Sequence, residues 1–163
     1  MEIQTQSVAE LLALYSEVIE ELQRRGVTRS SNNPVADYAE YLCVKALALR
    51  VADKSTKGFD AMDRDDCRYQ VKGRRLTHLN DSRQLGALRD LEAKPFDFLI
   101  GVLFTENFRV YKACQLPIAK IPRGQYIART NSWRIVLHDN LWSLPGAIDL
   151  TDKLRKAQAK HGF

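Results

Sequence analysis

The order of elements in the sequence predicts an α/β (α+β) fold, in which a central mixed sheet of four to five strands is flanked by helices. Two observations carry this prediction. Apolar residues recur at helical spacing near both ends of the chain, and short alternating or continuous apolar runs, typical of strands, fill the middle. The chain of 163 residues has the usual length of one domain, so residues 1–163 are expected to form a single domain.

A first helix is predicted over residues 7–25. Ser7 and Glu10 have the spacing of a capping box, and Gly26 follows as the glycine that ends the helix. One side of this helix is apolar along its length. Together with the polar loop after it, the helix makes up an N-terminal part, residues 1–33, ahead of the expected core.

A second helix is predicted from Pro34 to about residue 52. Proline suits the first turn of a helix, Asn33 can cap it, and a broad apolar face follows. Glu40 lies among the apolar residues in sequence, and its helix neighbours put it at or near the edge of the buried face. Glu40 can therefore reach a site beside the sheet.

The remaining elements are mostly strands. Two strands are expected over 59–62 and 67–72, with a turn at 64–66 between them and Gly73 at the end of the second. A strand covered on both faces is expected over 96–104, and further strands over 109–114 and 133–137. Residues 116–131 look irregular, and helices are expected over 83–92, capped by Ser82, and over 151–159.

The composition limits the class of protein. A hydrophobic share of 45% and a charged share of 28% are ordinary for a globular chain and exclude intrinsic disorder. The formal charge of +5 favours polyanionic partners such as DNA, RNA or an anionic membrane. No basic leader and no run of 18 apolar residues is present, so we expect a cytoplasmic protein without a membrane partner. Three widely spaced cysteines indicate neither a disulfide framework nor a zinc site.

One arrangement in the middle of the chain carries chemistry. If the strands 59–62 and 67–72 pair in antiparallel fashion, Asp60 comes close to the end of the second strand. Gln70 and Lys72 are two residues apart and therefore point to the same face of the sheet. The result is a carboxylate, an amide and an ammonium group in one place.

These groups suit the hydrolysis of a phosphodiester. Mg²⁺ (or Mn²⁺) prefers oxygen ligands, which Asp60, the side chain of Gln70 and the backbone carbonyl of Val71 can supply. Lys72 can orient an attacking water and stabilise charge on the phosphate. Glu40 adds a second carboxylate from the helix. We therefore expect a catalytic and metal site at these five residues.

The same pattern resembles a known superfamily. Gly58-Phe59-Asp60, followed about ten residues later by Gln70-Val71-Lys72 and preceded by a helix with Glu40, resembles the PD-(D/E)xK superfamily of restriction-endonuclease-like nucleases. The resemblance covers roughly residues 34–114, the nuclease-like core, and leaves 115–163 as a C-terminal extension. It implies a central mixed four-stranded sheet and Mg²⁺-dependent DNA cleavage.

The resemblance also implies roles for single residues. Asp60 would be the metal carboxylate, Lys72 the catalytic lysine, and Glu40 the helical acid present in some members. The sequence departs from the pattern at Gln70, where most members have an acid, and at Phe59, where the pattern has proline. Glutamine removes one negative charge and should weaken metal binding without excluding activity.

Basic residues follow the expected site. Residues 72–89 contain Lys72, Arg74, Arg75, Arg83 and Arg89, and Asp81 is the one acid among them. The local charge of +4 is most of the excess of the whole chain, and such side chains can hold DNA phosphates and fix register. Gln84 can face either the substrate or solvent.

Each of these residues also has a purely structural interpretation, and three functions stay open. Asp60 could cap a turn, Glu40 could pair with a helix neighbour such as Lys45, and the basic run could be a solvated strand end. Beside a nuclease, Gln70 motivates a non-catalytic nucleic-acid-binding module with the same fold. The third alternative is a subunit of a defence or mobile-element system, with a partner protein for recognition or a homodimer formed through the first helix.

Overall fold

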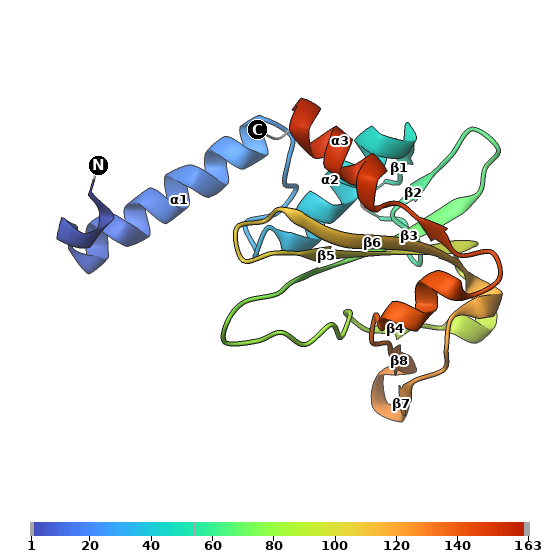
Figure 1. Cartoon of the computed structure of the whole chain (residues 1–163). Helices are drawn as coiled ribbons and strands as arrows, with labels where there is room; N and C mark the ends of the chain where they lie inside the picture. The colour runs from blue at the N-terminus through green and yellow to red at the C-terminus, as the bar shows by residue number, and fades with distance from the viewer. Residues whose placement is uncertain (1, 54, 162–163) are drawn as a thin grey trace.

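A computed structural model describes residues 2–53 and 55–161 and gives an α+β fold with a mixed six-stranded sheet at its centre (Figure 1). Among these residues the strands run in the spatial order β1 (Arg50–Val51), β2 (Ala61–Met62), β3 (Arg68–Arg75), β5 (Phe98–Phe104), β6 (Val110–Pro117) and β9 (Ile148–Asp149). The pair β3 and β5 is parallel, and the other neighbours are antiparallel. The predicted sheet of four to five strands was too small, because the edge strands β1 and β9 have two residues each and leave no periodic pattern.

Three α-helices and a small second sheet complete the fold in the described residues. The helices are α1 (Val8–Arg24), α2 (Val35–Leu47) and α3 (Thr151–His161), and the second sheet has the order β4 (Leu88–Arg89), β8 (Ser132–Arg134) and β7 (Gln125–Ile127). The terminal helix is confirmed. The second sheet was missed in part: residues 116–131 were expected to be irregular but contain β7, and the last strand is shorter than the predicted 133–137.

The central sheet is covered on both faces. Helices α2 and α3 lie on one side of it, and the β4–β8–β7 sheet lies on the other (Figure 1). Strand β5 contributes to both cores, because Val102 and Phe104 pack with α2 while Leu99 and Leu103 pack in the opposite layer. The prediction of a strand buried on both faces is confirmed.

The two N-terminal helices have the predicted starts. In α1, Ser7 Oγ accepts a hydrogen bond from the Glu10 backbone N–H at 3.3 Å, and the Glu10 carboxylate accepts one from the Ser7 N–H at 2.7 Å. Gly26 has a φ of 70°, as its role at the helix end requires. Asn33 Oδ1 accepts the Val35 N–H at 3.1 Å.

Helix α2 ends earlier than predicted. Ala48 takes a left-handed conformation with a φ of 52°, and β1 begins at Arg50. The apolar pattern continues to about residue 52 because the chain past the helix end is still partly buried: Leu49 is 7% exposed. Apolar character alone therefore did not locate the end of the helix.

Strand β3 continues past Gly73, which was expected to close it. The glycine instead allows α2 to lie close to the sheet. A Cβ at this position would lie 2.8 Å from the Val35 carbonyl oxygen and 2.9 Å from the Ala39 Cβ. Gly73 is thus a packing glycine inside the strand.

The helix predicted over 83–92 is wrong. This segment is extended: Leu85 N–H donates to the Ile135 carbonyl at 2.9 Å, and Leu88 belongs to β4. Ser82 Oγ accepts the Gln84 N–H at 3.3 Å in a local turn and caps no helix. The leucines at three-residue spacing are all buried, but they reach the core from an irregular chain.

In residues 2–53 and 55–161, no helix combines the length and the apolar character needed to cross a membrane.

Candidate functional site

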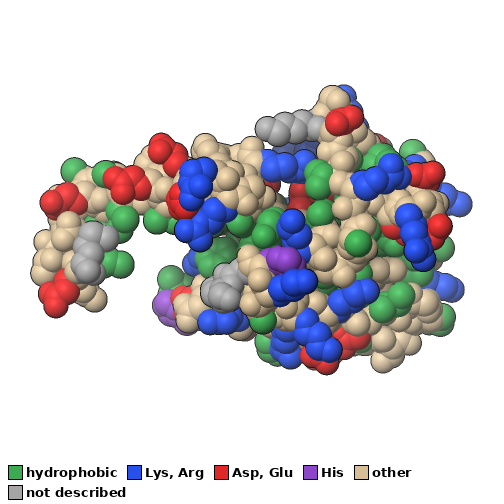
Figure 2. Space-filling view, turned by 90° about the horizontal axis from the view of Figure 1, so that it is seen from above, with side chains coloured by type: hydrophobic (Ala, Val, Ile, Leu, Met, Phe, Trp, Pro, Cys, Tyr) green, Lys and Arg blue, Asp and Glu red, His purple; other side chains and the backbone are tan. Residues whose placement is uncertain are grey.

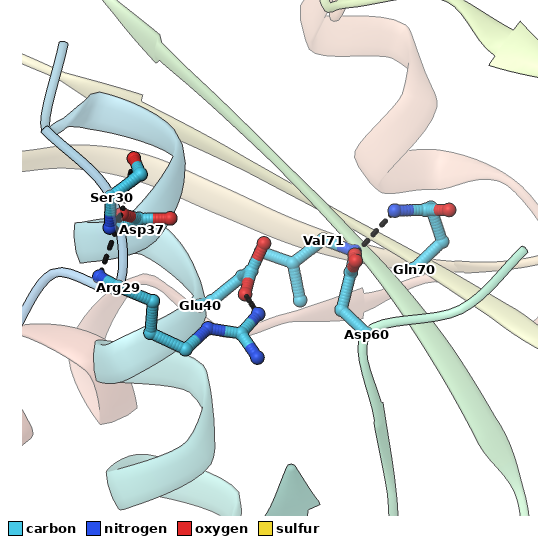
Figure 3. A network of polar contacts seen from close by, with 7 residues as sticks. All are labelled: Arg29, Ser30, Asp37, Glu40, Asp60, Gln70 and Val71. Atoms are coloured by element: carbon cyan, nitrogen blue, oxygen red, sulfur yellow. Dashed lines mark hydrogen bonds and ion pairs between the residues drawn. The ribbon is translucent and has the colours of Figure 1, made fainter. Parts of the chain in front are cut away.

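Asp60 lies directly before β2, beyond the last residue pair that joins β2 to β3. Its backbone N–H donates to the Tyr69 carbonyl at 2.8 Å, as expected for the predicted antiparallel pairing of Ala61 with Tyr69. Its carboxylate oxygen Oδ2 accepts the Val71 N–H at 2.7 Å and a hydrogen bond from the Gln70 amide nitrogen (Figure 3). The structure therefore brings Asp60 against residues 70 and 71.

The carboxyl group of Asp60 is mostly buried. Burial raises the pKa of this carboxyl group, while the Val71 hydrogen bond and the charges of Lys72 and Arg29 act to lower it. Lys72 follows Val71 in β3, directly after the N–H that Asp60 accepts, and its charge acts on Asp60 from there. Asp60, Gln70 and Lys72 thus form one cluster.

Glu40 reaches the same region from α2. Figure 3 shows its side chain between Arg29 and the strand that carries Val71. Burial and the charge of Asp60 raise the pKa of Glu40 to about 7, although the guanidinium of Arg29, with which Glu40 forms an ion pair, opposes the rise. The alternative pairing of Glu40 with Lys45 is not found; the Lys45 ammonium lies over the Tyr41 ring.

Arg29 is held beside Glu40 by a network that the sequence did not reveal. Asp37 Oδ2 accepts three hydrogen bonds: from the Arg29 N–H at 2.8 Å, and from the N–H and hydroxyl of Ser30 at 3.0 Å each (Figure 3). These bonds fasten the loop before α2. No motif links residues 29 and 37, because their contact depends on how the loop folds back on the helix.

Glu40 and Lys72 approach Asp60 from opposite faces of the sheet. Val71 packs in the core under α2. Lys72, one residue on, points the other way: its Cδ would lie 3.7 Å from a Cβ at Gly86, in the opposite layer.

Two small cavities border Asp60. One has a volume of about 250 Å³ and is also lined by Arg29, Asp37 and Phe59. The other, about 280 Å³, is lined by Glu40 and Val71 as well as Asp60. Each is large enough for several waters, which occupy about 30 Å³ apiece, and so for a partly hydrated cation.

The donor groups fit a hard divalent cation. Mg²⁺ needs only one or two carboxylates and keeps several waters. Asp60 supplies one carboxylate, and the Val71 carbonyl faces the same open strand edge as its N–H, which points at Asp60. A cation would also offset the charge of Asp60, which adds to burial in raising the pKa of Glu40. Among the described residues, however, no three His, Cys, Asp or Glu side chains form a metal-binding group, so neutral oxygens and water would have to complete the shell.

Gln70 does not face Asp60 as expected. Its amide nitrogen donates to the carboxylate, so its amide oxygen points away (Figure 3). A half-turn of the amide would bring the oxygen to the site, at the cost of this hydrogen bond.

The basic residues after the site do not form one patch. Arg83 pairs with Asp139 at 2.7 Å, and the Arg75 guanidinium lies 4.8 Å from the centre of the Phe108 ring. Arg89 is exposed in β4 of the second sheet. Their charges are therefore divided among three regions of the surface.

Arg74 and Gln84 do share a place. Both line a cavity of about 450 Å³ between β3 and the second sheet, on the face to which Lys72 points. Arg129 and Arg134 line the same cavity. Within the described residues neither they nor Arg74 forms an ion pair with an acid, and no acid lines the cavity. From the sequence, Arg129 was singled out only as a residue of the irregular region that could contact substrate, and Arg134 was missed, because β7 and β8 are needed to bring them there.

Comparison of the chain with protein-family models and with curated proteins found no match. What can be said of its function therefore depends on the residues around Asp60.

Proposed function

We propose that this protein is a metal-dependent, restriction-endonuclease-like nuclease that hydrolyses phosphodiester bonds in DNA. The observation that carries the proposal is the Asp60 carboxylate, held at the point where β2 separates from β3. Lys72 follows Val71, whose N–H the carboxylate accepts, and Glu40 reaches the same region from α2 (Figure 3). A metal-dependent nuclease needs a group that accepts a proton from water, a positive charge near the phosphate and a ligand for the metal ion. Glu40, Lys72 and Asp60 are the respective candidates.

The metal in this proposal is Mg²⁺ or Mn²⁺. Asp60 and the Val71 carbonyl would hold it, with Gln70 joining after its amide turns. When bound, such an ion lowers the pKa of a coordinated water and withdraws charge from a phosphate oxygen.

The protein's own groups have distinct tasks. Glu40, whose pKa of about 7 suits proton transfer near neutral pH, accepts a proton from the attacking water. The new phosphorus–oxygen bond forms as the bond to the leaving sugar oxygen breaks, and that oxygen takes up a proton from solvent. The Lys72 ammonium stabilises the negative charge on the phosphate. Arg74, Arg129 and Arg134 hold neighbouring phosphates of the strand.

The test is nicking of supercoiled plasmid at low salt with Mg²⁺, Mn²⁺ or EDTA. We expect metal-dependent nicking that falls at least a hundredfold in Asp60→Ala and in Lys72→Ala. Matched controls are Asp65→Ala, on the exposed turn after β2, and Lys153→Ala, on the exposed side of α3; both should cleave like the wild type. Activity that survives the two site substitutions would rule the proposal out.

A second function has an observation of its own. The Gln70 amide and the Arg29 guanidinium already satisfy Asp60 and Glu40 without a metal. A protein with this arrangement could bind nucleic acid and not cleave it. Plasmid that shifts in a gel with the wild type, with no nicking in either metal, would favour this binding module.

A further inference from the structure

Helix α1 projects from the domain (Figure 1), and most of its apolar face is exposed. Val8, Leu12, Tyr15 and Val18 are 74, 64, 54 and 48% exposed, and Ile19 is the buried residue of this helix. Five of the eleven exposed large hydrophobic residues in the described chain lie between residues 3 and 18. Such a concentration marks an interaction surface, whereas scattered single residues would not.

The spacing on α1 is that of a helix that packs along another helix. Val8, Tyr15 and Leu22 recur every seven residues, with Leu11 and Val18 between them. An isolated helix of this length, 17 residues, is marginal in water. A partner for this face would therefore stabilise the helix.

The molecule itself offers a groove for such a helix. A cavity of about 750 Å³ lies between the second half of α1 and the body of the domain, and Figure 2 shows the surface hollowed there. Its apolar lining comes from α1, α2 and the β5–β6 turn: Tyr15, Val18, Leu22, Tyr38, Tyr41 and Phe108. This is the lining expected of a site for an amphipathic helix.

The distribution of charge along the chain indicates which helix binds in the groove. Residues 2–23 contain five glutamates and no lysine or arginine, while all 25 Lys and Arg and the other 15 acids follow, for a net charge of +10. The groove is lined by Arg25, Arg75, Lys160 and His161 and by no acid. Its basic edge matches the acidic start of the chain, and such complementarity favours association.

We propose that the groove binds α1 of a second copy of this chain, and that the exchange is reciprocal. The apolar face of each helix enters the partner's groove. Glu10 and Glu17, on the side of α1 opposite Val8 and Tyr15, stay outside the groove. Helix and groove belong to the same chain, so the contact repeats by twofold symmetry and closes as a dimer.

Light scattering coupled to size exclusion tests the helix. The wild type should show twice the chain mass of 18.6 kDa and dissociate on dilution. Leu12→Glu, and at the tip of the helix Val8→Glu, should raise the dissociation constant at least tenfold. Neither side chain is buried, so circular dichroism should show the domain still folded. Leu79→Glu, at a residue 86% exposed and distant from α1 in sequence, is the matched control and should leave the dimer intact.

Two further variants test whether the groove is the binding site. Arg75→Glu and Lys160→Glu put acids on an edge that faces an acidic helix, and each should also weaken the dimer about tenfold. A monomeric mass at every concentration, or a dimer that tolerates Val8→Glu and Leu12→Glu, would overturn the proposal. Sensitivity to the helix variants without any effect of Arg75→Glu and Lys160→Glu would overturn the groove as the binding site.

Discussion

At the scale of single residues, Glu40 is an acid whose surroundings oppose its charge. Burial and the charge of Asp60 raise its pKa from 4.5 to about 7, Asp37 acts in the same direction, and Arg29 opposes them. A buried carboxyl group of this kind is stable as the neutral acid and costs free energy when it ionises. The same property that suits Glu40 to proton transfer therefore makes the fold sensitive to pH.

The expected outcome is a stability that falls as pH rises. The folded-state pKa lies above the unfolded one, so the contribution of Glu40 is fully present below about pH 4.5 and is lost as the pH passes about 7. A shift of this size corresponds to roughly 3 kcal/mol in the free energy of unfolding. Glu40→Gln keeps the shape without the titration, so its stability should fall less over this range.

Urea unfolding in EDTA at pH values from 4.5 to 8 measures this difference. Asp60, whose pKa is also raised, contributes with the same sign to both proteins, so the difference between the two profiles reports Glu40 together with its interaction with Asp60. Parallel profiles for the wild type and Glu40→Gln would show that Glu40 ionises freely in the folded protein.

At the scale of elements, the sequence could predict what depends on near neighbours. The hairpin that brings Asp60 to Gln70 was predicted because alternation and a short turn specify antiparallel pairing locally. The ion pair of Arg29 with Glu40 was not predictable, because it depends on a loop that folds back on α2. The false helix over 83–92 has the same cause: tertiary contacts, and not the spacing of its leucines, decide the conformation of that segment.

The close packing of α2 against Gly73 of β3 leaves no room for a larger side chain. A side chain there would meet the Val35 carbonyl oxygen at 2.8 Å, so α2 would have to move away from β3. Gly73→Ala should lower the free energy of unfolding by about 1–3 kcal/mol, as overpacking does. At Gly86 the nearest atom to a new Cβ is the Lys72 Cδ at 3.7 Å, an ordinary contact, so Gly86→Ala is the matched control.

Chemical unfolding measures the free energy of unfolding of the two variants and of the wild type. Because Glu40 lies on α2, Gly73→Ala should also reduce any metal-dependent activity. Equal stability of Gly73→Ala and the wild type would mean that α2 can shift without loss, and that the close contact between helix and strand is not needed.

At the scale of the whole molecule, charge is unevenly distributed. The first 23 residues are acidic, and the remainder of the chain is strongly basic. Figure 2 shows acidic side chains along the projecting helix and basic ones gathered where it joins the domain and beyond. In the proposed dimer, this division would bring the acidic helix against a groove of opposite charge.

DNA binding should therefore depend steeply on salt and on the cavity between β3 and the second sheet. Each phosphate contact that is lost reduces the slope of log affinity against log salt by about 0.9 for duplex DNA. Arg129→Gln and Arg134→Gln should each lower the slope by about this amount, because both arginines line that cavity. Arg64→Gln, on the exposed turn after β2, removes the same charge at a residue that does not line the cavity and should change the slope little. Fluorescence anisotropy with a labelled duplex measures the slope for all three variants between about 50 and 200 mM salt, a roughly fourfold range that resolves such slopes. Equal slopes for the three variants would place the DNA elsewhere on the surface, and an absence of binding at low salt would contradict both the nuclease and the binding module.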